Sequence, residues 1–418
     1  MGVNDRRFFA CPALIPHLLE KVLFAGTFVP SIPRCAASIP REIGSGMTIA
    51  RVAANLTSGY QTVPVVAERR AEPLFLAPVS VRAMPDFRSE LSALVSETGF
   101  SGVIRIDQDD RIEFARAYGL AHRGFEIPNQ VDTRFAIASG AKGFTALAVV
   151  SLIEEGVLEL STPARSVLGH DLPLIDDGVT IEQLLAHRSG IGDYLDEEGG
   201  FEVADYVMPV PVHHLATTED YLAVLDGYPS KFAPGERFAY SNGGFVVLAL
   251  VAERTSGVPF HELVEQRVCR PAGMMDTEYL RSDELPARTA LGYVECDGVW
   301  RTNVFHLPVR GSGDGGIYST AADISALWRA FVAGRIVSTE WVAQMVRPRS
   351  DVPAESKRYG LGFWLHRSTD AVILEGCDAG VSFRSVHDPR TRATQTVISN
   401  TAEGAWPIAR CLENAASS

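Results

Sequence analysis

Ser139 and Lys142 are the two residues of this sequence whose types and spacing most clearly suggest chemistry. The chain has 38 basic residues, only four of them lysines, and Lys142 stands in the otherwise uncharged run 136–150. A buried lysine can lose its proton and act as a base, whereas an arginine cannot. Residues three apart share one face of a helix, so the serine hydroxyl and the lysine amine are expected to meet. The spacing predicts a nucleophile beside its activator.

The same pair also has a purely structural explanation, in which the serine caps a helix and the lysine stem lies along apolar surface. The scarcity of lysine elsewhere favours the catalytic explanation. In that explanation Ser139 lies in the first turn of a helix, near unpaired backbone N–H groups and the positive end of the helix dipole. Both would stabilise negative charge that develops during attack on a carbonyl group.

A second segment, 232–245, places polar residues at the start of an apolar helix expected over about 244–252. Tyr240 could supply a phenol base there, and Asn242 an amide that holds a substrate or a neighbouring side chain. An ordinary buried aromatic residue would also fit the tyrosine position. The segment adds a possible proton carrier to the Ser139 and Lys142 pair.

A third segment, Glu375-Gly376-Cys377, follows a predicted strand. Glycine at a strand end allows another backbone to approach closely, so a substrate could add there as an extra strand. These three residues are candidates for substrate binding.

The elements that must position these segments come mainly from the two ends of the chain. Strands at both ends around a helix-rich middle predict an α/β (α+β) fold, with one antiparallel sheet built from both termini, flanking helices and an inserted, mainly helical region. We expect a domain over 84–418, with sheet regions at about 84–138 and 310–418 and the helical region at about 139–309. The expected elements are a helix at 85–98, a hairpin with strands at 103–106 and 112–114 and a turn at 107–110, strands at 371–374, 381–386 and 394–398, and a helix at about 405–415.

The composition restricts the possible partners. The 418 residues are 46% apolar and 21% charged, with a net charge of −13. The negative charge argues against nucleic acid and anionic membranes as main partners. Six cysteines are scattered without metal-ligand spacing, so neither a metal site nor a disulfide framework is predicted.

The first 83 residues show little patterning and are expected to form an N-terminal extension. Arg6-Arg7-Phe8-Phe9 faintly resembles a twin-arginine export signal. Neither apolar run that follows reaches the roughly 20 residues that span a bilayer, so no membrane span is expected. A cytoplasmic location is favoured over export.

Taken together, the motifs resemble the penicillin-recognising serine hydrolase superfamily, in the subgroup of class C β-lactamases, D,D-peptidases, D-aminopeptidases and β-lactamase-like carboxylesterases. The resemblance covers about residues 84–415 and implies a β-lactamase/transpeptidase-like fold. Blocks in the right order are more specific than a lone Ser-x-x-Lys motif. The matching blocks are Thr133-x-Phe135 with Ser139-x-x-Lys142, Leu184–Gly190, Phe232-x-Pro234-Gly235 with Tyr240-Ser241-Asn242, Arg270–Thr277 and Gly315–Thr320.

The resemblance implies a role for each candidate residue. Ser139 would attack a carbonyl and form an acyl-enzyme, and Lys142 would take or relay its proton. Tyr240 would pass a proton to the leaving group and later activate the deacylating water. Asn242 would bind the substrate or the lysine, and the backbone N–H groups of Ser139 and Cys377 would form an oxyanion hole. No metal or other cofactor is implied, and the remaining blocks are expected to be scaffold, namely those around His187, Pro271 and Gly315.

The third catalytic element departs from the family pattern. The family usually has Lys-Thr-Gly or His-x-Gly, whereas the matching positions here are Leu374-Glu375-Gly376, with no lysine or histidine between His366 and His387. The cation that helps to hold a substrate carboxylate is therefore expected to be missing. Glu375 would repel such a carboxylate if it faces the cleft, or would face solvent at the strand end.

The sequence thus predicts a serine hydrolase that acts through an acyl-enzyme on small ester, amide or short peptide substrates, most simply neutral or amine-bearing ones. A β-lactamase or D,D-peptidase is the first alternative. The second is a non-catalytic binding or assembly protein that has kept the scaffold. Transfer of the acyl group to an alcohol or amine instead of water also stays open.

Overall fold

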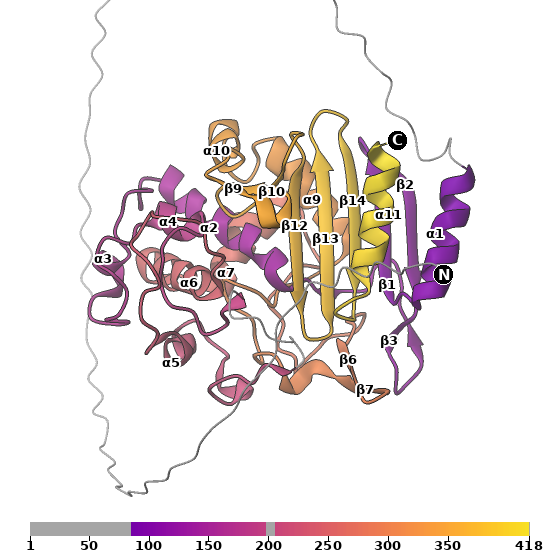
Figure 1. Cartoon of the computed structure of the whole chain (residues 1–418), viewed down its shortest axis with the longest axis horizontal. Helices are drawn as coiled ribbons and strands as arrows, with labels where there is room; N and C mark the ends of the chain where they lie inside the picture. Colours follow the sequence, from indigo (N-terminus) through magenta and orange to yellow (C-terminus); the bar gives the residue numbers. More distant parts are fainter. Residues whose placement is uncertain (1–84, 198–204, 418) are drawn as a thin grey trace, which may run out of the picture. The chain divides into compact units, whose positions relative to one another are not determined.

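An eight-stranded antiparallel sheet forms the centre of the protein (Figure 1). The computed structural model describes residues 85–197 and 205–417. Strands from the two ends of the described chain are neighbours, because β1 pairs with β14 along its whole length. This confirms the prediction of one sheet built from both termini. In sheet order, the strands are β2 Arg111–Tyr118, β1 Gly102–Gln108, β14 Ala393–Ser399, β13 Val381–Asp388, β12 Val372–Asp378, β11 Trp364–His366, β10 Lys357–Tyr359 and β9 Ser350–Val352.

Helices flank the sheet and dominate the region inserted between its strands. The α-helices are α1 Pro85–Thr98, α2 Ala141–Glu154, α3 Arg165–Leu168, α4 Ile181–Leu185, α5 Leu222–Leu225, α6 Asn242–Ser256, α7 Phe260–Val264, α8 Arg270–Ala272, α9 Ala321–Val332, α10 Thr339–Met345 and α11 Ala405–Ser417. Short strand pairs join the inserted region: β3 Leu120–His122 with β4 Ile127–Pro128, β5 Phe135–Ala136 with β8 Tyr318–Ser319, and β6 Tyr293–Cys296 with β7 Val299–Thr302.

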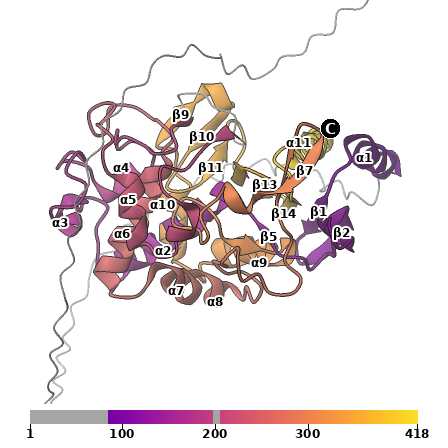
Figure 2. The ribbon, with the colours of Figure 1, turned by 90° about the horizontal axis from the view of Figure 1, so that it is seen from below.

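Alternation of side chains gives the sheet two apolar faces. In β1, Ile104 and Ile106 pack into a core with α1 and α11, whereas Val103 joins the larger core that contains α2, α6 and α9. Figure 2 shows α9 and α11 on opposite sides of β13 and β14. The sheet therefore separates a smaller outer core from the larger core that supports α2.

Helices α2 and α6 lie in the middle of the larger core. All residues of α2 from Ala141 to Ile153 are buried, as are those of α6 from Asn242 to Ala252. A helix that is apolar on every side belongs in an interior. The burial of Lys142 follows directly from its place on α2.

Some elements are longer than the sequence pattern predicts. β1 continues through Asp107, which was expected in a turn, because its carboxylate accepts hydrogen bonds from the Arg105 guanidinium (2.8 Å) and from Ser325 Oγ (2.5 Å). β12 runs to Asp378 instead of ending at Leu374, because it pairs with β13 up to that residue. In both strands, tertiary contacts override weak local preference for β structure.

Residues 1–83, with the expected extension and the Arg6-Arg7 motif, lie outside the described part of the chain. Within residues 85–197 and 205–417, no helix is both long enough and apolar enough to cross a membrane.

Candidate active site

Ser139 and Lys142 meet where the chain enters α2. Ser139 lies in the 3-10 turn Ala138–Gly140, just before α2, and Lys142 lies in the first turn of that helix. Lys142 Nζ is 2.9 Å from Ser139 Oγ. Ala138 has a φ of 45°, which is uncommon for a residue with a side chain and is often found where function constrains the backbone. The turn therefore presents the serine hydroxyl directly to the lysine amine.

The Lys142 ammonium makes three hydrogen bonds in a buried position. Besides Ser139 Oγ, it donates to Asn242 Oδ1 at 2.8 Å and to the carbonyl oxygen of Asp314 at 2.7 Å. Burial lowers the pKa of Lys142, while the negative charges of Asp314 and Glu197 act in the opposite direction. The amine is thus held in a place where its neutral form is easier to reach than in water.

The Asn242 amide is oriented by its other contacts. Its Nδ2 donates to the carbonyl oxygen of Leu195 and to Glu197 Oε1, both at 3.0 Å. The Oδ1 atom must then face Lys142. Asn242 becomes the first residue of α6 because the Ser241 hydroxyl caps that helix, accepting a hydrogen bond from the Gly244 N–H at 3.0 Å.

Tyr240 lies beside the same amine. Lys142 Nζ is 4.9 Å from the centre of the Tyr240 ring. Burial raises the pKa of Tyr240 well above its usual range, the charge of Glu197 adds to this, and a hydrogen bond with the Ser139 side chain partly opposes it. Tyr240 is therefore a neutral phenol. This state suits donation of a proton to a leaving group better than action as an ionised phenolate base.

His187, which the sequence places in the scaffold, holds the backbone on both sides of Tyr240. Its Nδ1 accepts a hydrogen bond from the Ser241 N–H at 3.0 Å, and its carbonyl oxygen accepts one from the Ala239 N–H at 2.9 Å. The His187 and Tyr240 ring centres are 4.3 Å apart. Burial, and secondly the charge of Lys142, lowers the pKa of His187 well below its usual value, so the ring is neutral and Nδ1 is available as an acceptor.

Trp364 in β11 adds an aromatic wall that sequence reasoning missed. Its ring lies nearly parallel to that of Tyr240, with 6.0 Å between centres and 9° between planes. Tyr359 in β10 packs edge-on against the Trp364 ring, with 4.8 Å between the ring centres. The centre of the Tyr359 ring also lies 4.7 Å from that of His187. The sequence carries no signal for this wall, because the contacts join strands to a loop more than 100 residues away.

Strand β12 passes directly against the nucleophile turn at Gly376. A Cβ atom on Gly376 would lie 2.5 Å from both the Ile137 carbonyl oxygen and the Ser139 nitrogen, so only glycine fits. The side chain of Cys377 lies elsewhere, with Sγ 3.6 Å from the Ala402 carbonyl oxygen. The pairing of β11 with β12 covers only Val372 and Ile373. The predicted third element is therefore beside Ser139, at a strand segment that β11 does not cover.

Glu375 differs from both expectations made for it. Its carboxylate neither stands as an unpaired charge nor simply faces solvent, because it forms an ion pair with Lys357 Nζ of β10. We expected the third element to lack a cation, but the neighbouring strand β10 brings the Lys357 ammonium to Glu375. The sequence did not predict the contact of Lys357 with Glu375, because Lys357 precedes Glu375 by 18 residues and belongs to a different strand.

Acidic residues whose charges act on Lys142 were missed by sequence reasoning as well, and two of them, Asp193 and Asp314, are buried. Burial raises the pKa of Asp193 to about 6 and that of Asp378 to about 7. Asp314, which accepts a hydrogen bond from the Tyr194 hydroxyl, and Glu197 also have raised pKa values because of burial. These residues lie in loops or at a strand end, where the sequence pattern does not reveal burial.

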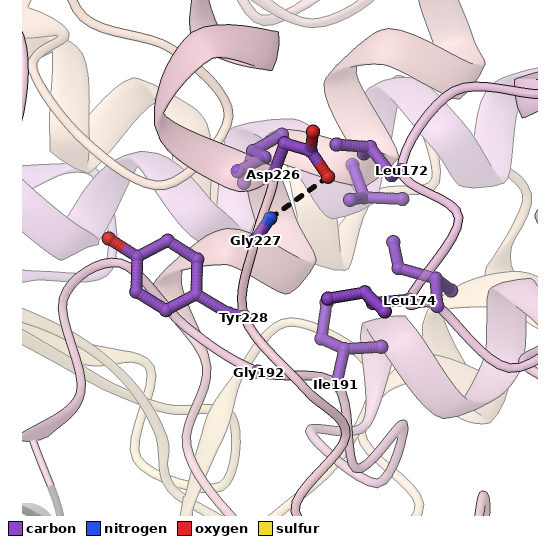
Figure 3. A pocket seen from close by; sticks show the side chains of 10 residues that line it. Leu172, Leu174, Ile191, Gly192, Asp226, Gly227 and Tyr228 are labelled. Carbon is purple, nitrogen blue, oxygen red and sulfur yellow. Dashed lines mark hydrogen bonds between the residues drawn. The ribbon is translucent and has the colours of Figure 1, made fainter.

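In the described ranges, no group of three or more histidine, cysteine, aspartate or glutamate residues is arranged to hold a metal ion. A small pocket in the helical region lies apart from the candidate residues (Figure 3). It is lined by Leu172, Leu174, Ile175, Ile191, Gly192, Leu225, Asp226, Gly227, Tyr228 and Val247. None of the candidate catalytic or substrate-binding residues is among these, and we assign the pocket no role.

Gly376→Ala is expected to slow the reaction of Ser139 by about 100-fold or more, the size of effect seen when an oxyanion donor is lost. The added methyl group would displace β12 or the serine turn. The rate of Ser139 labelling by a fluorophosphonate, followed by intact mass, measures this. Gly124→Ala is the control, because a Cβ there meets only the His122 side chain, at 3.4 Å. A labelling rate like that of the wild type would contradict the close approach.

His187→Ala is expected to lower the free energy of unfolding by about 1–3 kcal/mol, because it leaves the buried Ser241 N–H without an acceptor. It should reduce kcat more than it raises KM, because Tyr240 loses its support. His187→Asn should recover part of both, since asparagine offers an acceptor and tolerates the φ of 54° at this position. Denaturant unfolding and steady-state kinetics test this; equal behaviour of the two variants would argue against the hydrogen bond.

Comparison with known proteins agrees with this geometry. Residues 87–416 match the model of the Beta-lactamase family. The chain is 30% identical to esterase EstB of Burkholderia gladioli over 290 residues, which are 60% of this chain and 71% of EstB. It is 28% identical to a penicillin-binding protein of Bacillus subtilis (strain 168) over 301 residues, 68% of this chain and 64% of that relative. The chain therefore spans about two thirds of the length of these two relatives.

A solved structure of a penicillin-binding protein from Bacillus halodurans superposes with a TM-score of 0.74 and 37% identity, covering 78% of this chain and 99% of that one. The predicted β-lactamase/transpeptidase-like fold is thereby confirmed. The family match over most of the sequence and this structural likeness together show that the chain belongs to the β-lactamase family, within the penicillin-recognising serine hydrolase superfamily.

Proposed function

We propose that this protein is a serine hydrolase that forms an acyl-enzyme with small ester or amide substrates. The observation that carries the proposal is the buried contact of Lys142 Nζ with Ser139 Oγ, beside Tyr240 and against β12. The relation to esterase EstB supports the ester substrate class.

In acylation, Ser139 Oγ attacks the carbonyl carbon and its proton moves to the neutral Lys142 amine. The hydrogen-bond pattern suits this transfer. Asn242 Oδ1 and the Asp314 carbonyl oxygen accept two N–H groups in either charge state of the lysine. Only the bond to Ser139 has to reverse, since a neutral amine has a lone pair that can accept from the hydroxyl.

The tetrahedral intermediate then collapses, and the carbon–oxygen or carbon–nitrogen bond to the leaving group breaks. Tyr240, a neutral phenol, donates its proton to the leaving group and is reprotonated from the Lys142 ammonium. In deacylation, water attacks the acyl carbon while the same groups carry its proton, and Ser139 recovers its hydrogen. The backbone N–H groups of Ser139 and Cys377 would hold the carbonyl oxygen throughout.

A β-lactamase or D,D-peptidase is the second candidate, favoured by the relation to penicillin-binding proteins. The carboxylate of Glu375 in the third element counts against it, because it is paired with the Lys357 ammonium, the cation that could otherwise hold a substrate carboxylate. A non-catalytic binding protein is a weaker candidate, since such a protein would have no need for Ser139, Lys142, Tyr240 and Asn242 together.

Intact-mass spectrometry tests these candidates after parallel exposure to a fluorophosphonate, a p-nitrophenyl ester and a penicillin. Ser139→Ala should abolish labelling and turnover, because the nucleophile is removed, while thermal unfolding stays close to that of the wild type. Labelling by the first two reagents alone supports the ester and amide proposal. A lasting penicilloyl adduct would favour a penicillin-binding peptidase, and no adduct with any reagent would favour the binding protein.

Lys142→Arg should lower kcat/KM for the p-nitrophenyl ester by at least about 1000-fold, because arginine keeps the positive charge but cannot give up its proton. Steady-state kinetics with the same ester measures the loss. Lys231→Arg serves as the matched control, because Lys231 forms an ion pair with Asp196 and arginine can keep that pair. Activity of Lys142→Arg near that of the control would make Lys142 an electrostatic neighbour instead of a base.

A further inference from the structure

We propose that Glu375 sets the substrate class of this site: its carboxylate pairs with the Lys357 ammonium beside Trp364, which stacks on Tyr240, and thereby excludes substrates that carry a carboxylate there. The inference rests on the proposed hydrolase function and names the substrates that the same site accepts. It begins from the Glu375–Lys357 ion pair, which the linear sequence does not reveal.

The pair lies at the wall of the site. Lys357 belongs to β10, two strands away from β12, and it reaches Glu375 by passing over Trp364, with Nζ 5.0 Å from the centre of that ring. The Trp364 ring in turn stacks on Tyr240. Glu375 immediately precedes Gly376, whose backbone contacts Ser139. A cation and a carboxylate thus face each other one residue from the strand segment that meets the nucleophile.

The charges around Lys357 leave it little attraction for an outside anion, because the two cations Lys357 and Arg384 are paired with three carboxylates. The side chains of Lys357 and Glu375 are only 12% and 14% exposed, so the pair is partly desolvated. Glu355 Oε2 lies 3.8 Å from Lys357 Nζ, and Arg384 Nε lies 3.8 Å from Glu375 Oε2. Arg384 is also paired, with Glu413 of α11.

A substrate carboxylate could reach Lys357 only by displacing Glu375, which would leave that partly desolvated carboxylate with the more distant Arg384. A neutral ester or amide disturbs none of these contacts. The side chain at position 375 therefore decides whether Lys357 is free to bind a substrate carboxylate or is held in an ion pair within the protein. Removing the charge of Glu375 should turn Lys357 into a carboxylate-binding group.

Matched ester pairs that differ only in one carboxylate test the inference. On the leaving-group side we would use 4-acetoxybenzoic acid and its methyl ester, and on the acyl side mono-p-nitrophenyl succinate and its methyl ester. The measured quantity is the ratio of kcat/KM for the anionic ester to that for the neutral ester. Glu375→Gln should raise this ratio by at least about tenfold for one of the two pairs, and the gain should shrink in high salt.

Two further variants identify the cause. Lys357→Met in the Glu375→Gln background should return the ratio to near the wild-type value, because the freed cation is gone. Glu355→Gln removes an equal charge at 3.8 Å from Lys357 without touching β12, so it should change the ratio by less than about twofold. Glu375→Thr replaces Glu375→Gln if the latter fails to fold, as judged by thermal unfolding.

The inference is wrong if the ratio stays at the wild-type value in a folded Glu375 variant that still turns over the neutral esters. It is also wrong if Glu355→Gln raises the ratio as much, since net charge alone would then explain the effect. A different result would overturn the proposed hydrolase function. In that case the wild-type protein would neither react with the fluorophosphonate at Ser139 nor turn over any of the four esters.

Discussion

Burial of the Lys142 amine is the constraint on which the rest of the site depends. An amine in an apolar core is costly unless its hydrogen bonds are satisfied, and α2 is buried along almost its whole length. The chain meets this demand with three acceptors drawn from separate places: the serine turn, the start of α6 and the loop at Asp314. One polar group thereby ties together three segments that are distant in sequence. The same contacts that make the burial tolerable also orient the groups expected to take part in the chemistry.

A second constraint is the contact between β12 and the serine turn. Gly376 lets the strand approach Ser139 more closely than any residue with a Cβ could. The strand cannot be moved without disturbing the sheet, since it pairs with β13 from Val372 to Asp378. The position of the nucleophile is thus fixed from one side by α2 and from the other by the sheet. This explains why the candidate pair Ser139 and Lys142 stands at a junction between the helical region and the strands.

The sequence predicted the parts of this site that depend on local spacing. Ser139 and Lys142 were found from their separation on a helix, and the sheet from alternating strands at both ends of the chain. Asp314, Glu197 and Trp364 were not found, because their roles come from burial and from contacts between distant segments. His187 was predicted to be scaffold, but its hydrogen bond to the backbone next to Tyr240 depends on loop geometry that spacing does not encode.

The third element shows most clearly that the residue types of one segment do not reveal what a neighbouring strand contributes. Position for position, Leu374-Glu375-Gly376 lacks the expected cation, and the sequence alone left open whether Glu375 repels a substrate carboxylate or faces solvent. In space, β10 supplies the ammonium of Lys357, and Glu375 neutralises it. The site therefore differs from the family pattern in two ways at once, by the origin of its cation and by the presence of an internal carboxylate that holds it. Electrostatic complementarity at this position therefore has to be judged from neighbouring strands together and not from one motif.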